Sequence, residues 1–413
     1  MSLSLRHISH RRTSCSKIGA KSFRRREPCK LSVPSAIKDP KTTRSLDAKE
    51  FIRKHILELA PYKSIVPFDV LSEKLNRPTS DIVKLDANEN PYGPPPEVFS
   101  ALKNIEFPHI YPDPESRKLR GLLAQECRIP IENIMIGCGA DELIDLVLRA
   151  ILEPKDVLIN TPPTFGMYEF DCSINITVNV PRKPAPSFGI DVKSIKEAVF
   201  KNNAKILMIT SPNNPDGSVI SREEIEELLE LPCLVVLDEA YIEFYGVEHS
   251  LVGEVPKRQN LIVLRTFSKR AALAGLRVGY GVFPLHLIEF LWRMKQPYNV
   301  SVVAELAACA ALSNPDYLED VKNALVSERE NMFEMMSKFS FLEPYESQSN
   351  FILCRVISGR AEELKNFLES DGVIVRYYSS PPELSGCIRV SVGLPEHTVR
   401  LKSALLKYME NSK

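Results

Sequence analysis

Residues 261–280 read LIVLRTFSKRAALAGLRVGY, so two apolar runs are joined by a polar loop. The runs, 261–264 and 278–283, are apolar throughout, as in strands that are buried on both faces of a sheet. Lys269 follows the first run. A lysine held at the end of a buried strand loses hydration, which favours the neutral amine and makes it a nucleophile able to form a Schiff base. Arg277 would supply a fixed positive charge for a phosphate. The ordinary alternative for Lys269 is a solvated surface side chain.

Similar apolar runs alternate with helical patterns before this stretch, at 134–136, 157–159, 206–210 and 234–237. Such alternation predicts an α/β fold with a mostly parallel central sheet covered by helices on both faces. Beyond residue 297 the runs FILCRV, VIVRYY and CIRVSVG, with helical segments, predict a smaller α+β domain. We therefore expect an extension over 1–38, an N-terminal arm with part of the small domain over 39–89, a large domain over 90–297 and a small C-terminal domain over 298–413.

The first 38 residues differ in charge from the rest of the chain. They contain ten of the 53 Lys and Arg residues but one of the 53 acids, Glu27, and they are rich in Ser. This composition predicts an organelle transit peptide, with plastid favoured over mitochondrion; the alternative is a disordered basic tail that binds an anionic partner. The remaining 43 basic and 52 acidic residues argue against a nucleic-acid surface.

Two classes of site are not expected. No run reaches the roughly 18 apolar residues of a membrane span, so we expect a soluble mature protein. The nine cysteines include no CxxC pair, which favours reduced thiols over disulfides or a metal site.

Polar residues follow three more of the predicted strands. GCGADE (137–142) opens a helix, whose exposed amides at Gly139, Ala140 and Asp141 could hold a phosphate. A dinucleotide-binding GxGxxG pattern fails because residue 142 is Glu. SPNNPDG (211–217) contains Asn214, and its plain alternative is a turn.

The third segment, LVVLDEAYIEF (234–244), delivers Asp238 to a strand end. A capping or ion-paired aspartate is the ordinary alternative. An apolar run ending in Asp-Glu also occurs in nucleotide-hydrolysing enzymes, but the GxxxxGK[ST] loop of that class is absent from the sequence.

Taken together, GADE, SPNNPDG, LDEAY and TFSKRAALAGLRVGY resemble, in order and spacing, the fold-type I pyridoxal-phosphate aminotransferases. The resemblance runs from about Pro61 to the C-terminus. Within that group KLDANENPYG, YPDP, PPTFGMY and LSGCIRVSVG are similar to the histidinol-phosphate aminotransferase family, and the basic extension suggests its plant chloroplast form.

The resemblance implies a cofactor site for pyridoxal phosphate. Lys269 would be the Schiff-base lysine and proton shuttle, Asp238 would pair with the pyridinium nitrogen, and Tyr241 with Asn214 would hydrogen-bond the ring 3′-oxygen. Phe165 would stack on the ring. The phosphate would be held by Gly139, Ala140, Asp141, Thr266, Ser268 and Arg277, and by Tyr111 of a neighbouring subunit, so a homodimer is implied.

The same resemblance implies the reaction of histidinol phosphate and 2-oxoglutarate to imidazole-acetol phosphate and glutamate, in L-histidine biosynthesis. Arg389 and Asn214 would bind the α-carboxylate end of the substrate, and Arg376 the distal phosphate or carboxylate, with Tyr62 helping from the arm. Exposed side chains are the alternative for Arg376 and Tyr62. Competing functions are an aromatic amino-acid aminotransferase, a decarboxylase of a phosphorylated amino acid, and a non-catalytic binding protein with this fold.

Overall fold

The computed structural model describes residues 47–59, 65–173, 175–357 and 359–411, so the basic extension and Tyr62 lie outside the described residues. The chain divides into two units at Ile52 and Arg53. The described part of the first unit is one short 3-10 helix, η1 (Ala48–Phe51), which the side chain of Asp47 caps. Both sheets belong to the second unit.

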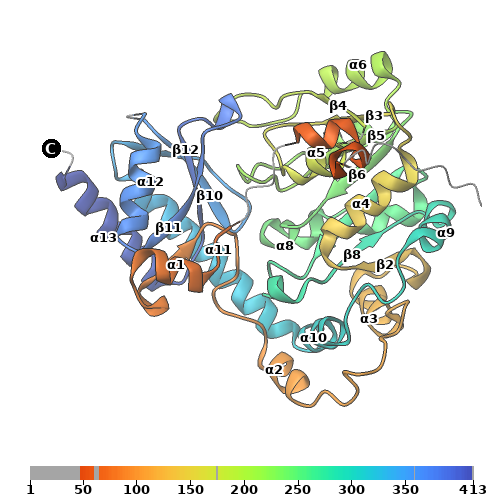
Figure 1. Cartoon of the computed structure of the whole chain (residues 1–413), viewed down its shortest axis with the longest axis horizontal. Helices are drawn as coiled ribbons and strands as arrows, with labels where there is room; N and C mark the ends of the chain where they lie inside the picture. Colours follow the sequence, from red (N-terminus) through yellow and green to blue (C-terminus); the bar gives the residue numbers. More distant parts are fainter. Residues whose placement is uncertain (1–46, 60–64, 174, 358, 412–413) are drawn as a thin grey trace, which may run out of the picture. The chain divides into compact units, whose positions relative to one another are not determined.

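The larger sheet has seven strands (Figure 1). In spatial order they are β2 (Ile134–Gly137), β8 (Gly279–Val282), β7 (Leu261–Thr266), β6 (Leu234–Asp238), β5 (Ile206–Thr210), β3 (Val157–Asn160) and β4 (Ile176–Asn179). The pairs from β7 through β6, β5 and β3 to β4 are parallel, whereas β8 is antiparallel to both β2 and β7. The β7–β8 connection, with the 3-10 turn η7 (Ala274–Leu276), contains no crossover helix, and a parallel pair would require one. The mostly parallel sheet expected from the sequence is confirmed.

Both faces of this sheet are covered. In β6, Val235 and Leu237 enter one hydrophobic cluster and Val236 enters the other, so the apolar run alternates between two cores. The first core includes residues of α2 (Pro96–Lys103), α3 (Arg117–Cys127), α6 (Val192–Asn202), α7 (Arg222–Leu229) and α10 (Val302–Leu312). The second includes residues of α4 (Gly139–Ile151), α5 (Met167–Asp171) and α9 (Leu285–Met294) (Figure 1). Burial on both faces is the dominant stabilising term for these strands.

The smaller sheet has the order β1 (Val83–Leu85), β11 (Val373–Tyr378), β12 (Cys387–Ser391), β10 (Phe351–Val356) and β9 (Leu342–Pro344). β1 pairs in parallel with β11, with Val83 opposite Val373, and the other pairs are antiparallel. Its core is completed by α12 (Ala361–Ser370), α13 (Pro395–Asn411) and the end of α11 (Pro315–Ser337). The domain boundaries expected at 89/90 and 297/298 stay predictions.

The remaining helices are short. They are η2 (Lys54–Glu58), α1 (Phe68–Leu75), η3 (Thr79–Asp81), η4 (Ile131–Asn133), α8 (Ile242–Tyr245), η5 (Val247–His249), η6 (Val252–Lys257) and η8 (Pro382–Leu384). Within the described ranges no helix is long and apolar enough to cross a membrane. Over the same ranges no cluster of three metal-ligating side chains occurs, and the seven cysteines are free thiols.

Candidate active site

The predicted site residues gather at one edge of the seven-stranded sheet. Thr210, Asp238 and Thr266 are the last residues of β5, β6 and β7, which are neighbours and parallel. The carboxyl ends of parallel strands are where ligands bind in open α/β sheets. The loops that follow these strands bring Asn214, Tyr241 and the segment from Ser268 to Arg277 to this edge.

Asp238 is buried, with 4% of its surface exposed. Its Oδ2 accepts a hydrogen bond from the Tyr168 hydroxyl at 2.6 Å, and its Oδ1 accepts one from the amide of Ala240 at 2.9 Å. Burial raises the pKa of Asp238 to about 6, although these two hydrogen bonds lower it. Among the ion pairs of the described residues none includes Asp238, and the charged groups that act on it, Asp141 and Glu239, are acids. A buried carboxylate of this kind fits a cationic ring nitrogen.

Phe165 lies in the loop after β3 and is half-buried. Its ring meets the ring of Tyr168 edge to face, with centroids 5.6 Å apart and planes at 83°. Tyr168 therefore contacts both the carboxylate and the aromatic side chain that the sequence predicts on the cofactor ring.

Cationic and hydroxyl groups gather at the N-terminus of α4. Arg277 Nη2 lies 2.9 Å from Asp141 Oδ2, and Arg277 Nη1 lies 3.5 Å from Ser268 Oγ. Thr266 donates its hydroxyl proton to Ser268 at 2.9 Å. The side chains of the Arg277–Asp141 pair are 44% and 43% exposed, so the pair contributes little to stability and an anion can rearrange it. Amides at a helix N-terminus, a guanidinium and a hydroxyl together fit a phosphate.

Two glycines allow this close approach. A Cβ at Gly139 would lie 2.6 Å from Arg277 Nη2, and φ at Gly139 is +80°. A Cβ at Gly279 would lie 2.7 Å from the amide nitrogen of Ala140. Each glycine leaves room that any side chain would fill, so the loop from Gly139 to Asp141 packs directly on β8 and beneath Arg277.

Lys269 and Tyr241 are neighbours. Lys269 Nζ lies 5.4 Å from the centre of the Tyr241 ring, and Tyr241 is buried. The Tyr241 hydroxyl accepts a hydrogen bond from Asn88 Nδ2 at 3.0 Å. Ser391 fixes Asn88 in turn. Its hydroxyl accepts a hydrogen bond from the backbone N–H of Asn88 at 2.8 Å and donates one to the side-chain Oδ1 of Asn88 at 3.1 Å. The orientation of Tyr241 thus depends on a residue from the KLDANENPYG loop.

Arg389 comes from β12 of the smaller sheet and is buried. It donates from Nη1 to Asn214 Oδ1 at 2.6 Å and from Nη2 to the carbonyl oxygen of Asp86 at 2.7 Å, whereas its buried Nε has no hydrogen-bond partner among the described residues. Arg376 lies opposite Arg389 in the β11–β12 register. Two guanidinium groups on adjacent strands suit a substrate with two anionic ends.

The family of the chain follows from sequence comparison. A family model for aminotransferase class I and II matches residues 80–401. The chain is 55% identical over 401 residues to a chloroplastic histidinol-phosphate aminotransferase of Nicotiana tabacum, covering 96% of each protein. It is 56% identical over 390 residues to chloroplastic histidinol-phosphate aminotransferase 1 of Arabidopsis thaliana, covering 94% of this chain and 92% of the relative.

The chain belongs to the histidinol-phosphate aminotransferase family.

Solved structures agree with this assignment. The structure of histidinol-phosphate aminotransferase from Sinorhizobium meliloti in complex with pyridoxal-5′-phosphate matches with a TM-score of 0.81 and 26% identity, covering 89% of this chain and all of that one. L-threonine-O-3-phosphate decarboxylase from Porphyromonas gingivalis matches with a TM-score of 0.70 at 24% identity, covering 80% of this chain and all of that one; this likeness shows the fold alone. The expected fold-type I architecture is confirmed. The chain is an enzyme, and the substrates of aminotransferases are small molecules.

Tyr111 is the predicted cofactor residue that the YPDP segment carries. Its side chain is 78% exposed and stacks on Tyr298, with ring centroids 4.6 Å apart and planes at 26°. Tyr111 therefore points to solvent in this chain.

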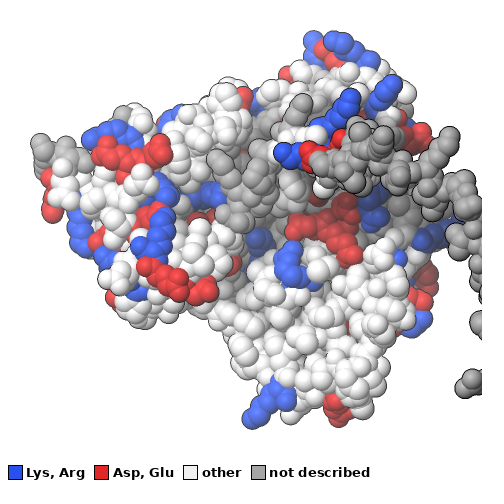
Figure 2. Space-filling view, viewed as in Figure 1, with Lys and Arg blue, Asp and Glu red and all other residues white. Residues whose placement is uncertain are grey.

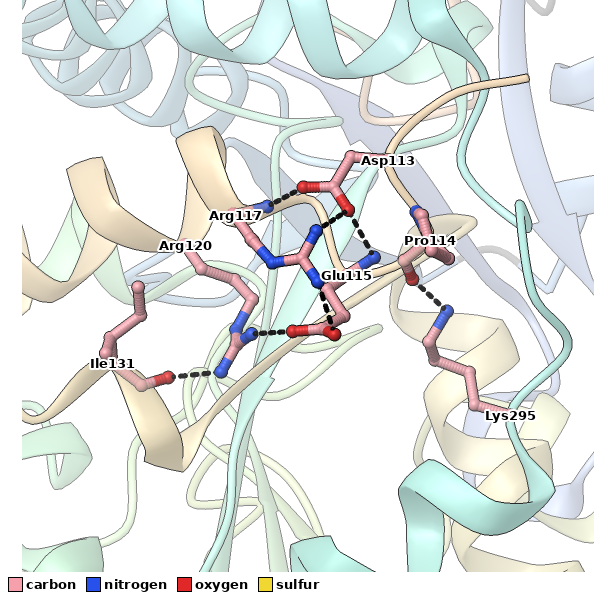
Figure 3. Close-up of polar contacts among 7 residues, drawn as sticks. All are labelled: Asp113, Pro114, Glu115, Arg117, Arg120, Ile131 and Lys295. Carbon is pink, nitrogen blue, oxygen red and sulfur yellow. Dashed lines mark hydrogen bonds and ion pairs between the residues drawn. The ribbon is translucent and has the colours of Figure 1, made fainter.

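The loop that carries Tyr111 makes several polar contacts at its far end (Figure 3). Arg117 lies 2.7 Å from Asp113 and 2.7 Å from Glu115, and Lys295 donates to the carbonyl oxygen of Pro114 at 3.1 Å. The last of these contacts connects the YPDP turn with the segment that follows α9.

Lys295 also connects this loop with the phosphate end of the site. It donates to Asn299 Oδ1 at 2.6 Å, and Asn299 donates from Nδ2 to Glu142 Oε2 at 2.7 Å. The same Glu142 oxygen accepts from the amide of Cys138 at 2.6 Å, directly before Gly139. A continuous set of hydrogen bonds thus joins the Tyr111 loop to the N-terminus of α4.

Two residues of the site were missed in the sequence. Tyr168 lies three residues after Phe165 in PPTFGMY, and Asn88 lies in KLDANENPYG; neither residue was assigned a role from the sequence. A tyrosine at the start of a short helix gives no local signal. For Asn88 a signal existed, because its φ of +54° is a conformation that asparagine adopts more readily than most residues.

Proposed function

We propose that this chain is a pyridoxal-phosphate-dependent transaminase that converts histidinol phosphate and 2-oxoglutarate to imidazole-acetol phosphate and glutamate, reversibly, in L-histidine biosynthesis. The observation that carries the proposal is Asp238, a buried carboxylate that accepts two hydrogen bonds and has no ion-pair partner in the part of the chain that the structure describes. The names of the relatives at 55% and 56% identity support the choice of substrate.

The residues present fit the cofactor. Asp238 would face its ring nitrogen, Phe165 its ring, and Asn214 with Tyr241 its 3′-oxygen. Its phosphate would lie at the Gly139, Ala140 and Asp141 turn with Thr266, Ser268 and Arg277. When bound, pyridoxal phosphate supplies an electron sink for the negative charge left when a proton leaves the substrate Cα.

Lys269 performs the proton chemistry in this proposal. Its Nζ would be the nucleophile that anchors the cofactor, and as the general base and acid it would take the proton from the substrate Cα and return it. Tyr241, over whose ring Nζ lies at 5.4 Å, limits the directions in which the amine can swing. Asp238 keeps the ring nitrogen protonated, so loss of its charge should reduce turnover by orders of magnitude.

Arg389 binds the α-carboxylate of glutamate through its planar fork. The fork already lies between Asn214 and the carbonyl of Asp86, so a carboxylate meets a guanidinium whose orientation is fixed. Arg376, opposite in the register, takes the phosphate of histidinol phosphate or the distal carboxylate of glutamate. Tyr62 stays a prediction for the same pocket.

A substrate comparison tests the proposal. Turnover of histidinol phosphate with 2-oxoglutarate is expected to exceed turnover of phenylalanine and tyrosine; preference for an aromatic amino acid would overturn the assignment in favour of an aromatic aminotransferase. Release of CO₂ from a phosphorylated amino acid would favour the decarboxylase.

A spectroscopic test addresses the non-catalytic alternative. Purified protein is expected to absorb visible light through its bound cofactor, and Lys269→Ala is expected to abolish this band. Wild-type protein that stays colourless after incubation with pyridoxal phosphate would show that the chain keeps the fold without the chemistry.

We propose further that the enzyme is a homodimer in which Tyr111 reaches the cofactor phosphate of the partner subunit. On the visible face, the surface over α2 and the loop towards α3 has few charged side chains (Figure 2). The exposed apolar residues there include Phe99, Phe107 and Ile110, besides Tyr111. Exposed apolar patches of this kind mark association surfaces.

Mixed dimers test this arrangement. In a dimer of one Lys269→Ala and one Tyr111→Phe subunit, the site with an intact Lys269 receives an intact Tyr111 only if the tyrosine crosses the interface. Cofactor affinity at that site should equal the wild-type value. An affinity equal to that of the Tyr111→Phe homodimer would place the tyrosine in its own subunit's site instead.

The proposed location is the chloroplast stroma, on the strength of the basic extension and of the chloroplastic relatives. Import into isolated plastids followed by mapping of the new N-terminus tests it; import into mitochondria alone would overturn it.

A further inference from the structure

We propose that Tyr168 is a positioning residue for Asp238: its hydroxyl keeps the carboxylate ionised and fixes the direction in which its free lone pairs point. The inference rests on the proposed function, because it takes Asp238 to face the cofactor ring nitrogen. Tyr168 itself does not touch the reacting atoms.

The hydrogen bonds around Tyr168 can run in only one direction. Its hydroxyl has a single proton, which it gives to Asp238 Oδ2 at 2.6 Å. Thr210 Oγ1, 2.8 Å from the same hydroxyl, must therefore be the donor in that contact. Thr164 cannot supply a competing proton, since its hydroxyl donates to Asn213 Oδ1 at 2.8 Å. The protons of Thr210 and Tyr168 both point towards Asp238.

This polarity favours the ionised carboxylate. If Asp238 were protonated on Oδ2, Tyr168 would have to turn its proton towards Thr210, and Thr210 would have to exchange its 2.8 Å contact for the longer one to Thr164 Oγ1, at 3.3 Å. Burial opposes ionisation, as do the negative charges of Asp141 on α4 and of Glu239 beside it. The pKa of Tyr168 is also raised, by its own burial, by Asp238 and to a smaller extent by Tyr241, so its hydroxyl keeps the proton that it donates. The Tyr168 hydroxyl and the amide of Ala240 are the groups that lower the pKa of Asp238, and of these only the hydroxyl can be removed by substitution.

Tyr168 also supports Phe165, the side chain that would stack on the cofactor ring. Its own side chain is fully buried on α5, and its ring supports Phe165 edge to face. Tyr168→Phe keeps this packing and removes the hydroxyl alone. The variant therefore separates the effect on Asp238 from an effect on the aromatic stack.

The matched control is Tyr345→Phe. Tyr345 is likewise buried, its hydroxyl accepts from Arg355 Nε at 3.0 Å, and its ring meets Phe188 edge to face at 5.1 Å and 73°. It belongs to a hydrophobic cluster that contains none of the proposed site residues.

For Tyr168→Phe we expect kcat to fall on the order of ten- to a hundredfold, the range for a hydrogen bond to a charged group. The acid limb of the kcat profile should move to higher pH by on the order of one unit, because Asp238 without this donor is protonated more readily. Equilibrium dialysis of the apoprotein with pyridoxal phosphate should give a Kd that is several-fold higher than the wild-type value and that rises further as pH falls. Thr210→Val should shift the same quantities in the same direction by less, and Tyr345→Phe should shift none of them.

The outcomes are distinguishable. A Tyr168→Phe protein that keeps the wild-type acid limb and cofactor Kd, while Asp238→Asn is inactive, overturns the positioning role and leaves the proposed function standing. A loss of activity in Tyr168→Phe without a shift of the acid limb also overturns the positioning role, because a structural role would explain that loss. An equal loss of activity in Tyr345→Phe has the same meaning. An Asp238→Asn protein with wild-type turnover overturns the proposed function itself.

Discussion

Replacing Gly279 with alanine tests how closely the phosphate end of the site packs on β8. The added Cβ would lie 2.7 Å from the amide nitrogen of Ala140, 2.8 Å from the carbonyl carbon of Gly139 and 2.9 Å from the carbonyl oxygen of Arg265. All three are backbone atoms, so no flexible side chain can swing aside. The turn at the start of α4 has to move away from β8.

The size of the effect follows from these distances. An ordinary contact begins at 3.4 Å, so the turn must retreat by about 0.7 Å. Overpacking of this kind costs about 1–3 kcal/mol of unfolding free energy. The same displacement weakens the contacts of the turn with the cofactor phosphate, so we expect the cofactor Kd to rise on the order of ten- to a hundredfold, which corresponds to about 1.4–2.8 kcal/mol of binding free energy.

Equilibrium dialysis of apoprotein with pyridoxal phosphate measures the Kd, and urea unfolding measures the stability. Gly275→Ala is the control, because Gly275 lies in the same β7–β8 connection and its Cβ would meet no atom within 4 Å. Wild-type affinity in Gly279→Ala would refute the close packing of turn and strand. An equal loss in Gly275→Ala would assign the effect to the connection as a whole.

Three further predictions concern charge. Burial raises the pKa of Asp238 to about 6, above its unfolded value of about 3.9, so ionisation of Asp238 should lower the unfolding free energy of the wild-type apoprotein by on the order of 2 kcal/mol as pH rises from about 4 to 6. Urea unfolding of Asp238→Asn at the same two pH values should show a smaller decrease in unfolding free energy than the wild type. An equal decrease would contradict the raised pKa of Asp238. Arg389→Lys should raise the KM for glutamate by about tenfold or more, since an ammonium cannot replace a fork that already spans two acceptors; an unchanged KM in steady-state kinetics would remove Arg389 from the carboxylate site. Arg265→Met should lower the unfolding free energy by about 3–5 kcal/mol, because it leaves the buried Glu239 without its ion-pair partner at 3.0 Å, and a urea midpoint near wild type would show that Glu239 is compensated elsewhere.

The strands of the large sheet could be predicted because their signal is local. Residues 206–210 form β5 with the predicted bounds, and the run at 234–237 ends one residue further on, at Asp238. β4 gave no apolar run, since it is an edge strand whose residues are half-buried or exposed. The direction of β8 could not be inferred from its composition; it depends on the connection that precedes it.

The site was predictable where a residue type is rare in its setting. A lysine after a buried strand and an aspartate at the end of another strand both oppose their ordinary preference for water, so Lys269 and Asp238 attract attention in a single sequence. Tyr168 and Asn88 do not. Their roles arise from hydrogen bonds to Asp238 and Tyr241, many residues away, which exist only in the folded chain.

The pairing of β1 with β11 has a consequence for the order of folding. β1 is the first strand of the described chain, yet its partner from Val373 onward is among the last segments that a ribosome makes. Contacts between such distant segments form slowly, because a long loop must close first. The seven-stranded sheet, complete at β8, can form well before, so nascent chains that end short of β11 should have a folded large sheet and a β1 segment open to proteolysis.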